Sequence, residues 1–333
     1  MNGRRRIGRR TAWALIILVA QLLVGLLVLV VPLDATPHRA PVTISAPAVV
    51  ASSLADRVNA MAGTPLEAGA VTDAETARTD VETGRVVAAL AIDLRLNRAT
   101  LYVSSAQGDA LTGAVSAVVQ AMAEPFAVSV VTEDVAPLPD GSAGQRGLRL
   151  VVAVTVLLGL AIAIGVTWRR GPVADRWSHA GQRVVLAVVV SAAGSAAVAV
   201  GAAGQVGGPW AGWWAVLTLT ALATSAATLA LAGVLGVAGV GLATLVFVVL
   251  AAPLTRIEHP LLLPATWGEV TPWLPHGAGL DAARQVAWFD GAGLTRPLVV
   301  LGAWVMVSVV ALVVARRERR RAGVDWRDAA TVR

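Results

Sequence analysis

The chain has 333 residues, of which 56% are hydrophobic, and this is too apolar for an ordinary soluble domain. It contains no cysteine, which excludes disulfides, thiolate metal sites and cysteine nucleophiles. It also contains no lysine, so a Walker-type phosphate-binding loop is excluded. The four histidines are scattered without an i, i+4 pair, and we therefore expect neither a metal site nor a cofactor.

Six stretches contain no Asp, Glu, Lys or Arg, and each is about as long as the ~20 residues that a helix needs to cross a bilayer. They are residues 13–32, 150–168, 184–202, 213–233, 234–254 and 297–315. Because lipid offers no partner for an unpaired backbone group, each stretch must be a helix. The sequence predicts an α-helical polytopic membrane protein with six transmembrane helices, one followed by a large insertion and then five.

The first stretch follows an arginine-rich segment, as the core of a signal peptide does. Its length exceeds the roughly 7–15 apolar residues of a secretory signal, which favours a retained signal-anchor over a cleaved peptide. Either way, we expect the residues after it to be exported.

Arginines cluster in three places: residues 1–12, the loop between the second and third stretches, and the tail 316–333. Threading six spans from an inside N-terminus puts all three clusters on the cytoplasmic side, as the positive-inside rule requires. The net charge of +6 thus reflects the orientation of the chain in the membrane. We therefore expect no nucleic-acid binding. The high content of Ala, Val, Gly and Arg without Lys indicates a GC-rich genome. We expect the chain in a bacterial plasma membrane, with both termini cytoplasmic.

Residues 33–147 carry seven arginines against thirteen acids, a sign opposite to that of the three clusters. Their apolar patterning predicts an extracytoplasmic α/β domain with the order β-α-β-α-β-β-α-β. Pro47 is expected to open the first helix and Gly63 to close it. Thr72 and Glu75 have the spacing of a capping box for the second helix.

In the second half of this domain, Pro125 should end the third helix, and alternating Phe126, Val128 and Val130 predict the last strand. Its acids, including Asp93, Asp109, Glu133 and Asp134, are interpreted as a solvated surface. No carboxylate pairs with a histidine or serine in a catalytic signature, so we expect no enzyme.

Residues 148–254 should form transmembrane helices two to five, with a tight turn near residues 232–236. Many small residues allow these helices to pack closely. The spans hold hydroxyls (Ser191, Ser195, Thr218, Thr220, Thr224 and Thr228) but no Asp, Glu or His. Proton-driven carriers usually place such a titratable group in the bilayer, so we expect the energy for any transport to come from another chain.

Residues 255–296 are expected outside the membrane yet keep apolar groups. Thr266 and Glu269 have capping-box spacing, and Pro272 and Pro275 should separate two short helices. A surface-lying amphipathic element and a re-entrant gate both fit this pattern.

Two stretches carry a resemblance to a known family. The first is residues 81–92 (VETGRVVAALAI), where a helix leads into a buried strand. The second lies before the last span and comprises Pro264, Trp267, residues 273–275 (WLP), Gly277, Asp281 and Arg284. Both are similar to segments of the ABC-2 type exporter permeases, in the branch with a large extracytoplasmic domain that includes phage-infection-protein-like membrane proteins.

The resemblance implies a homodimeric permease in the lipid bilayer that couples to a separate cytoplasmic ATPase and exports a substrate. It implies an ATPase-coupling loop at Arg169, Arg170, Asp175, Arg176 and Trp177. It implies an extracytoplasmic gate at Pro264, Trp267, Trp273, Pro275, Asp281 and Arg284. Many family members carry a long amphipathic helix before the first span, whereas here that segment is short, so a member without an ATPase is an alternative.

These patterns favour the permease of an ABC-2 type export system that moves a hydrophobic or amphipathic substrate outward. The alternative is a non-transporting membrane receptor or scaffold, whose acidic domain binds an envelope component or a protein partner. An ATPase that co-purifies with the chain would distinguish the two.

Overall fold

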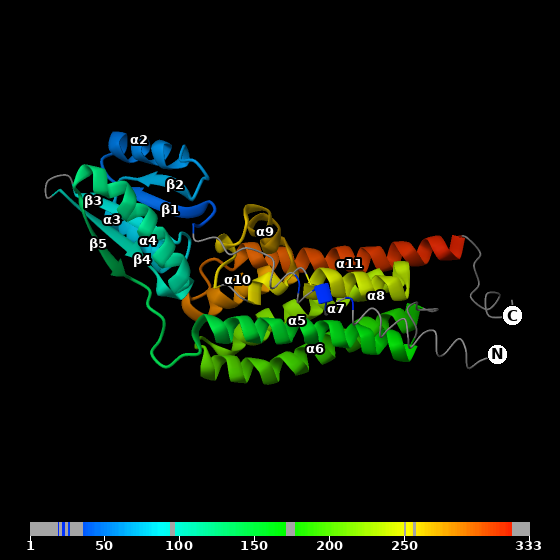
Figure 1. Cartoon of the computed structure of the whole chain (residues 1–333). Coiled ribbons are helices and arrows are strands. Elements are labelled where there is room, and N and C mark those ends of the chain that lie inside the picture. Colours follow the sequence, from blue (N-terminus) through cyan, green and yellow to red (C-terminus); the bar gives the residue numbers. More distant parts are fainter. Residues whose placement is uncertain are drawn as a thin grey trace.

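The computed structural model describes residues 36–93, 97–170, 177–249, 251–255 and 258–321, together with residues 19, 22, 23 and 26. These residues form an α/β lobe attached to one end of a helical bundle (Figure 1). Most of the predicted span at residues 13–32 lies outside the described residues, as do the arginine-rich residues 1–12 and most of the tail 316–333.

The lobe contains one five-stranded mixed sheet with the order β2-β1-β3-β4-β5. The strands are β1 (Ala40–Ser45), β2 (Leu66–Val71), β3 (Ala88–Asp93), β4 (Arg98–Val103) and β5 (Ser129–Asp134). Strand β1 pairs in parallel with β2 and β3, β3 pairs antiparallel with β4, and β4 pairs in parallel with β5. With helices α2 (Ala48–Asn59), α3 (Ala74–Glu82) and α4 (Asp109–Ala123) between them, the element order is the one predicted from the sequence.

The handedness of the connections decides which face of the sheet each helix covers. Connections between parallel strands are right-handed, so a step from β1 to β2 and the opposite step from β2 to β3 put α2 and α3 on opposite faces. Strands β4 and β5 run the other way, and their connection returns α4 to the face of α2. One face therefore carries two helices and the other carries one.

Local details of the lobe differ from the sequence prediction at three points. Asp73, not Thr72, caps α3, and its carboxylate accepts from the backbone N–H of Thr76 at 2.9 Å. The capping-box prediction was wrong by one residue because both candidate caps are adjacent and only one backbone geometry fits. Helix α2 ends at Asn59, before Gly63, and Phe126 lies in a 3-10 turn (Glu124–Phe126) rather than in β5.

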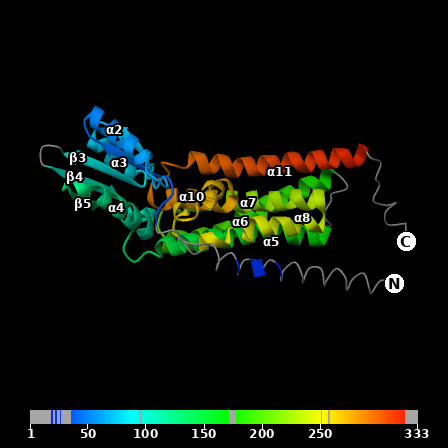
Figure 2. The same ribbon diagram turned by 45° about the horizontal axis from the view of Figure 1, so that its top comes forward.

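The bundle contains four helices that are long and apolar enough to cross a membrane. They belong to α5 (Gly144–Arg170), α6 (Trp177–Gln205), α7 (Trp210–Leu235) and α11 (Thr295–Arg321). In their most apolar windows, 72% of the residues of α7 are buried, against 17% for α11 and 22% for α6. Helix α7 is therefore the centre of the bundle, and α11 lies along one side of it (Figure 2).

Close packing around α7 depends on small residues. A Cβ at Gly159 of α5 would lie 2.5 Å from the carbonyl oxygen of Ala221 in α7, so only glycine allows the two backbones to approach this closely. The α7 hydroxyls of Thr220, Thr224 and Thr228 donate to carbonyls one turn earlier in the same helix, which satisfies them without a polar partner elsewhere.

The predicted fifth span is shorter and less regular than expected. Helix α7 continues to Leu235, Gly236 turns the chain with φ 65°, and α8 (Val237–Thr244) runs into a π-helical turn at Leu245–Val249. The described residues thus contain four spanning-length helices and one shorter apolar segment. They do not establish the number six.

The segment before α11 folds against the lobe-side end of the bundle. It contains α9 (Ala265–Val270), a 3-10 turn (Thr271–Trp273) and α10 (Pro275–Trp288). Thr266 lies inside α9 and the N-cap is Pro264, so the second capping-box prediction was also wrong. Helix α10 packs against α5, α7 and α11, and most of its residues are buried.

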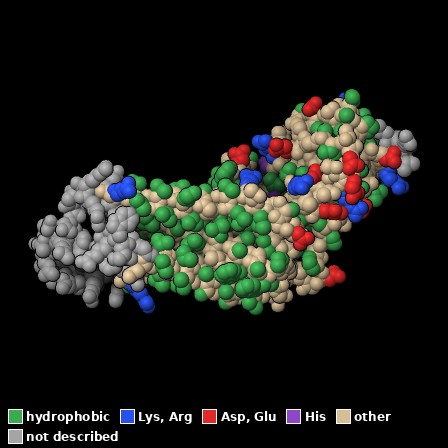
Figure 3. All heavy atoms as spheres, turned by 180° about the vertical axis from the view of Figure 1, so that it is seen from behind, with side chains coloured by type: hydrophobic (Ala, Val, Ile, Leu, Met, Phe, Trp, Pro, Cys, Tyr) green, Lys and Arg blue, Asp and Glu red, His purple; other side chains and the backbone are tan. Residues whose placement is uncertain are grey.

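Charged side chains avoid the middle of the bundle. On the face in Figure 3, hydrophobic side chains cover the bundle, while acids and arginines gather on the lobe and arginines recur at the far end. This distribution is that of a membrane-embedded protein with a polar lobe on one side.

Candidate functional site

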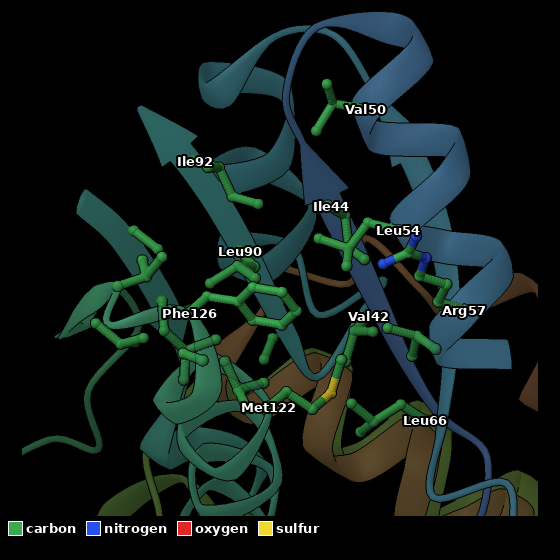
Figure 4. A pocket seen from close by; sticks show the side chains of 18 of the residues that line it. Val42, Ile44, Val50, Leu54, Arg57, Leu66, Leu90, Ile92, Met122 and Phe126 are labelled. Atoms are coloured by element: carbon green, nitrogen blue, oxygen red, sulfur yellow. The ribbon is translucent and has the colours of Figure 1, made fainter. Parts of the chain in front are cut away.

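An apolar groove lies on the two-helix face of the lobe. Helix α2 packs mainly on β2, and α4 packs on β5 at the other end of the sheet. The central strands β1 and β3 are left partly uncovered, and their side chains form the floor between the two helices (Figure 4). The groove is thus a consequence of the strand order and of the handedness of the crossovers.

The groove encloses about 580 Å³, within the roughly 300–1,000 Å³ range of small-molecule sites. Ile44 and Leu90 line its floor, and the small side chains of Ala88 and Ala99 deepen it. Leu54 of α2 lies on one side, and Figure 4 shows Met122 and Phe126 facing it from the other. A ligand in this space would meet hydrocarbon on nearly every side.

Two polar side chains, Ser53 and Arg57 of α2, line the groove in the described structure. Arg57 is exposed and forms no ion pair with any residue that the structure describes. An unpaired guanidinium beside an apolar trough can bind an anionic group at one end of an otherwise apolar molecule. Sequence analysis missed this site because the groove depends on how far apart α2 and α4 lie.

A second cavity of about 740 Å³ lies where the lobe meets the bundle. Trp273, Asp281 and Arg284, three of the six residues predicted to form a gate, line this junction cavity. Arg296, which the sequence analysis did not single out, lines it too, and its guanidinium carbon lies 5.6 Å from the centre of the Trp273 ring.

The other three predicted gate residues lie elsewhere in the segment. Pro264 caps α9, and Pro275 opens α10. The partly buried Trp267 packs against the hydrophobic cluster that joins α5, α7 and α10. All six predicted gate residues therefore lie in or beside α9, α10 and the turn between them, but only three of them line the junction cavity.

Arg284 and Asp281 form an ion pair with unequal burial. The guanidinium Nη1 of Arg284 donates to Oδ1 of Asp281 at 3.2 Å, and Nη2 donates to the carbonyl oxygen of Glu258 at 3.2 Å. The Arg284 side chain is only 4% exposed, whereas the Asp281 side chain retains 37% exposure towards the junction cavity.

Burial shifts the pKa values of both members of this ion pair. It raises the pKa of the Asp281 carboxyl, against the opposing charges of Arg284 and Arg296. Burial also lowers the pKa of the Arg284 guanidinium, and Asp281 opposes that change. Each charge therefore offsets part of the desolvation of the other.

Glu258 connects this ion pair to the lobe. Its Oε2 accepts from the backbone N–H of Ala110 in the first turn of α4 at 2.9 Å, where the helix dipole favours a negative charge. Nearby, Leu262 is buried in the hydrophobic core of the lobe, and the N–H of His38 donates to the carbonyl of Leu261. The segment that precedes α10 is therefore held against the lobe by both polar and apolar contacts.

The predicted ATPase-coupling loop is only partly visible. Asp175 and Arg176 lie outside the described residues. Arg169 is exposed near the end of α5, Arg170 is the last residue of that helix, and Trp177 is the first residue of α6. These positions lie at the end of the bundle opposite the lobe.

Within the described ranges, no group of three or more His, Asp or Glu side chains could hold a metal ion. Comparison with models of protein families, with curated proteins and with solved structures found no match for the chain.

Proposed function

We propose that this chain is the permease subunit of an ABC-2 type export system, which moves a hydrophobic or amphipathic substrate outward with energy from a separate ATPase. The observation that carries the proposal is the 580 Å³ apolar groove in a lobe fastened to the end of an apolar helical bundle. In this reading the lobe lies outside a bacterial plasma membrane, and the arginine-rich ends lie in the cytoplasm.

The contacts between the lobe and bundle support such a role. A permease must relate events in its spans to a substrate site outside the membrane, and α10 contacts three bundle helices while Arg284 reaches Glu258 and thus the start of α4. In this proposal the junction cavity is the gate region and the groove receives the substrate. The ATPase contacts the far end of the bundle near Arg169.

The test begins with purification from the native membrane, followed by mass spectrometry of co-purifying proteins. We expect a nucleotide-binding subunit, and we expect the reconstituted complex to hydrolyse ATP faster when an amphipathic substrate is present. Purification without such a subunit, together with no ATP-dependent movement of substrate after reconstitution, would refute the permease proposal.

Orientation has an independent test that uses the absence of cysteine. Ala70 is exposed on the edge strand β2, so Ala70→Cys introduces one reactive thiol on the lobe; Val332→Cys introduces one near the chain end. With intact cells, a membrane-impermeant maleimide should label the first variant and not the second. Equal labelling of both would contradict the proposed topology.

A receptor or scaffold that does not transport is the second candidate. The observation in its favour is that the groove lies wholly within the lobe and can hold a ligand without any path through the bundle. The back-bonded threonines of α7 fit this alternative as well. A chain that binds ligand but neither recruits nor stimulates an ATPase would favour it.

A further inference from the structure

We propose that the groove between α2 and α4 binds one long alkyl chain of an amphipath with an anionic head group, and that Arg57 pairs with that head. The shared chemistry is an alkyl chain ending in a carboxylate or phosphate. The identity of this amphipath as a transported substrate rests on the proposed function, whereas its binding to the lobe does not.

The length of the groove floor fits a single chain. The residues of β3 that line the groove run from Ala88 to Ile92, a span of about 13 Å at roughly 3.3 Å per residue. Two lipid chains end to end fill the hydrocarbon core of about 30 Å, so one chain extends for about 15 Å. The groove is one trough bounded by two helices, so a chain lying along the strands is covered on both sides.

The walls favour hydrocarbon over a polar ligand. A polar group placed on the floor would lose water and find no partner among Ile44, Leu90 and Ile92. A methylene placed there gains about 0.8 kcal/mol from burial. Met61 and Met122 both line the groove, and their flexible side chains can adapt to chains of different length.

The exposed rim indicates an unfilled site rather than a closed core. Phe126 is 66% exposed although it lines the groove, and Leu54 and Met122, which also line it, are only half-buried. Contiguous exposed apolar side chains beside a cavity are typical of a ligand-binding groove.

Arg57 determines the charge of the head group. It is the one ionisable residue that lines the groove in the described structure, and it has no ion-pair partner there. A carboxylate or phosphate beside its guanidinium gains charge-assisted hydrogen bonds, which a neutral head of the same size does not. An acyl amphipath with an uncharged head should therefore bind more weakly.

The experiment uses the full chain in nanodiscs of a zwitterionic phospholipid. The probe is hexadecanoic acid with a photoreactive diazirine at the end of its chain, and peptide mass spectrometry locates the adducts. We expect adducts on α2, β3 or α4 residues of the groove, with displacement by unlabelled hexadecanoate and weaker displacement by hexadecanol. Adducts confined to the bundle would overturn the proposal.

Two variants in the groove and one control variant outside it sharpen the test. Arg57→Gln should weaken hexadecanoate binding about tenfold and leave hexadecanol unchanged, whereas Arg98→Gln, on an exposed arginine outside the groove, should change neither. Ser53→Trp places a bulky ring at an exposed lining position and should reduce labelling by the diazirine probe without disturbing the buried core.

Equal hexadecanoate affinity in the wild type and Arg57→Gln would overturn the role of the charge. Unchanged labelling in Ser53→Trp would overturn the site. Dodecyl phosphate and a two-chain phosphatidic acid serve as further competitors, and stronger competition by the two-chain lipid would overturn the single-chain assignment. No ATPase is needed here, so failure of binding leaves the export proposal standing with another substrate, and failure of export leaves this binding site intact.

Discussion

The unequal burial of the Arg284–Asp281 pair gives an asymmetric response to mutation. In Asp281→Asn, the guanidinium of Arg284 remains 4% exposed and loses its charged partner. In Arg284→Met, the charge left behind is Asp281, whose side chain has 37% exposure and can be hydrated from the junction cavity. Asp281→Asn should therefore reduce the stability of the folded protein more than Arg284→Met does.

Removing one partner of a buried ion pair costs about 3–5 kcal/mol, and we assign this range to Asp281→Asn. Arg284→Met leaves a partly hydrated carboxylate and an unpaired Glu258 carbonyl, which we place at about 1–3 kcal/mol. At about 2 °C per kcal/mol for a chain of this size, the losses in Tm are about 6–10 °C and 2–6 °C. Tryptophan fluorescence during a thermal ramp in detergent measures both.

The control for this comparison is the double variant Asp281→Leu with Arg284→Met, in which no charge is left unpaired. It should melt above Asp281→Asn, because apolar residues can replace a buried ion pair. If Arg284→Met melts at the same temperature as Asp281→Asn or below it, the difference in burial does not determine the energetics of the pair, and the reasoning is wrong.

Three more predictions concern the same region. Burial lowers the pKa of His276 to about 4, so as the pH falls below ~6.5 the unfolded chain binds a proton that the folded chain does not. Relative to His276→Gln, the free energy of unfolding of the wild type should therefore fall by about 2–3 kcal/mol between pH 7.5 and pH 4.5. A pH-dependent difference in Tm between the two proteins measures this loss. Gly84 has φ +66°, and a Cβ there would lie 2.9 Å from the ring of Phe289. Gly84→Ala should therefore lower the free energy of unfolding by about 1–2 kcal/mol or more, and by less in a protein that also carries Phe289→Ala. Additive losses in the double variant would contradict the clash. Glu258→Gln removes the charge that accepts from the Ala110 N–H, and we expect faster hydrogen exchange in the first turn of α4, about 5–10-fold, with α2 unchanged as the internal control.

The four spanning-length helices of the described residues and the order of the lobe elements were predictable because each depends on local chemistry. A stretch without charge as long as a bilayer is thick can be recognised from the residues alone, and so can the alternation that predicts strands such as β4. The caps of α3 and α9 were wrong because neighbouring residues such as Thr72 and Asp73 are equally good caps, and tertiary geometry chooses between them.

Of the two cavities, the sequence predicted only those residues of the junction cavity that belong to the motif in residues 264–284. Asp281 and Arg284 are three residues apart on one helix, so their pairing follows from helical spacing. Glu258 contacts Arg284, which is 26 residues away in the sequence, and Ala110, which is 148 residues away. Local sequence patterns cannot predict contacts between residues so far apart. The groove depends on the distance between α2 and α4, which is decided by packing on different strands.

Helix α4 extends from the groove to the contact with Glu258 beside the junction cavity. Its later residues Val119 and Met122 line the groove, while the N–H of Ala110 at its start is held by Glu258, whose carbonyl in turn accepts from Arg284. A 15-residue α-helix is a stiff rod about 22 Å long, so a change of its tilt at the groove also turns the N–H groups of its first turn at the junction. If the groove binds an alkyl chain as proposed and α4 tilts on binding, the change reaches Glu258 and, through Arg284, helix α10, which packs on α5, α7 and α11. Linkage is reciprocal, so a rearrangement of the bundle that shifts α10 must alter the affinity of the groove by the same factor.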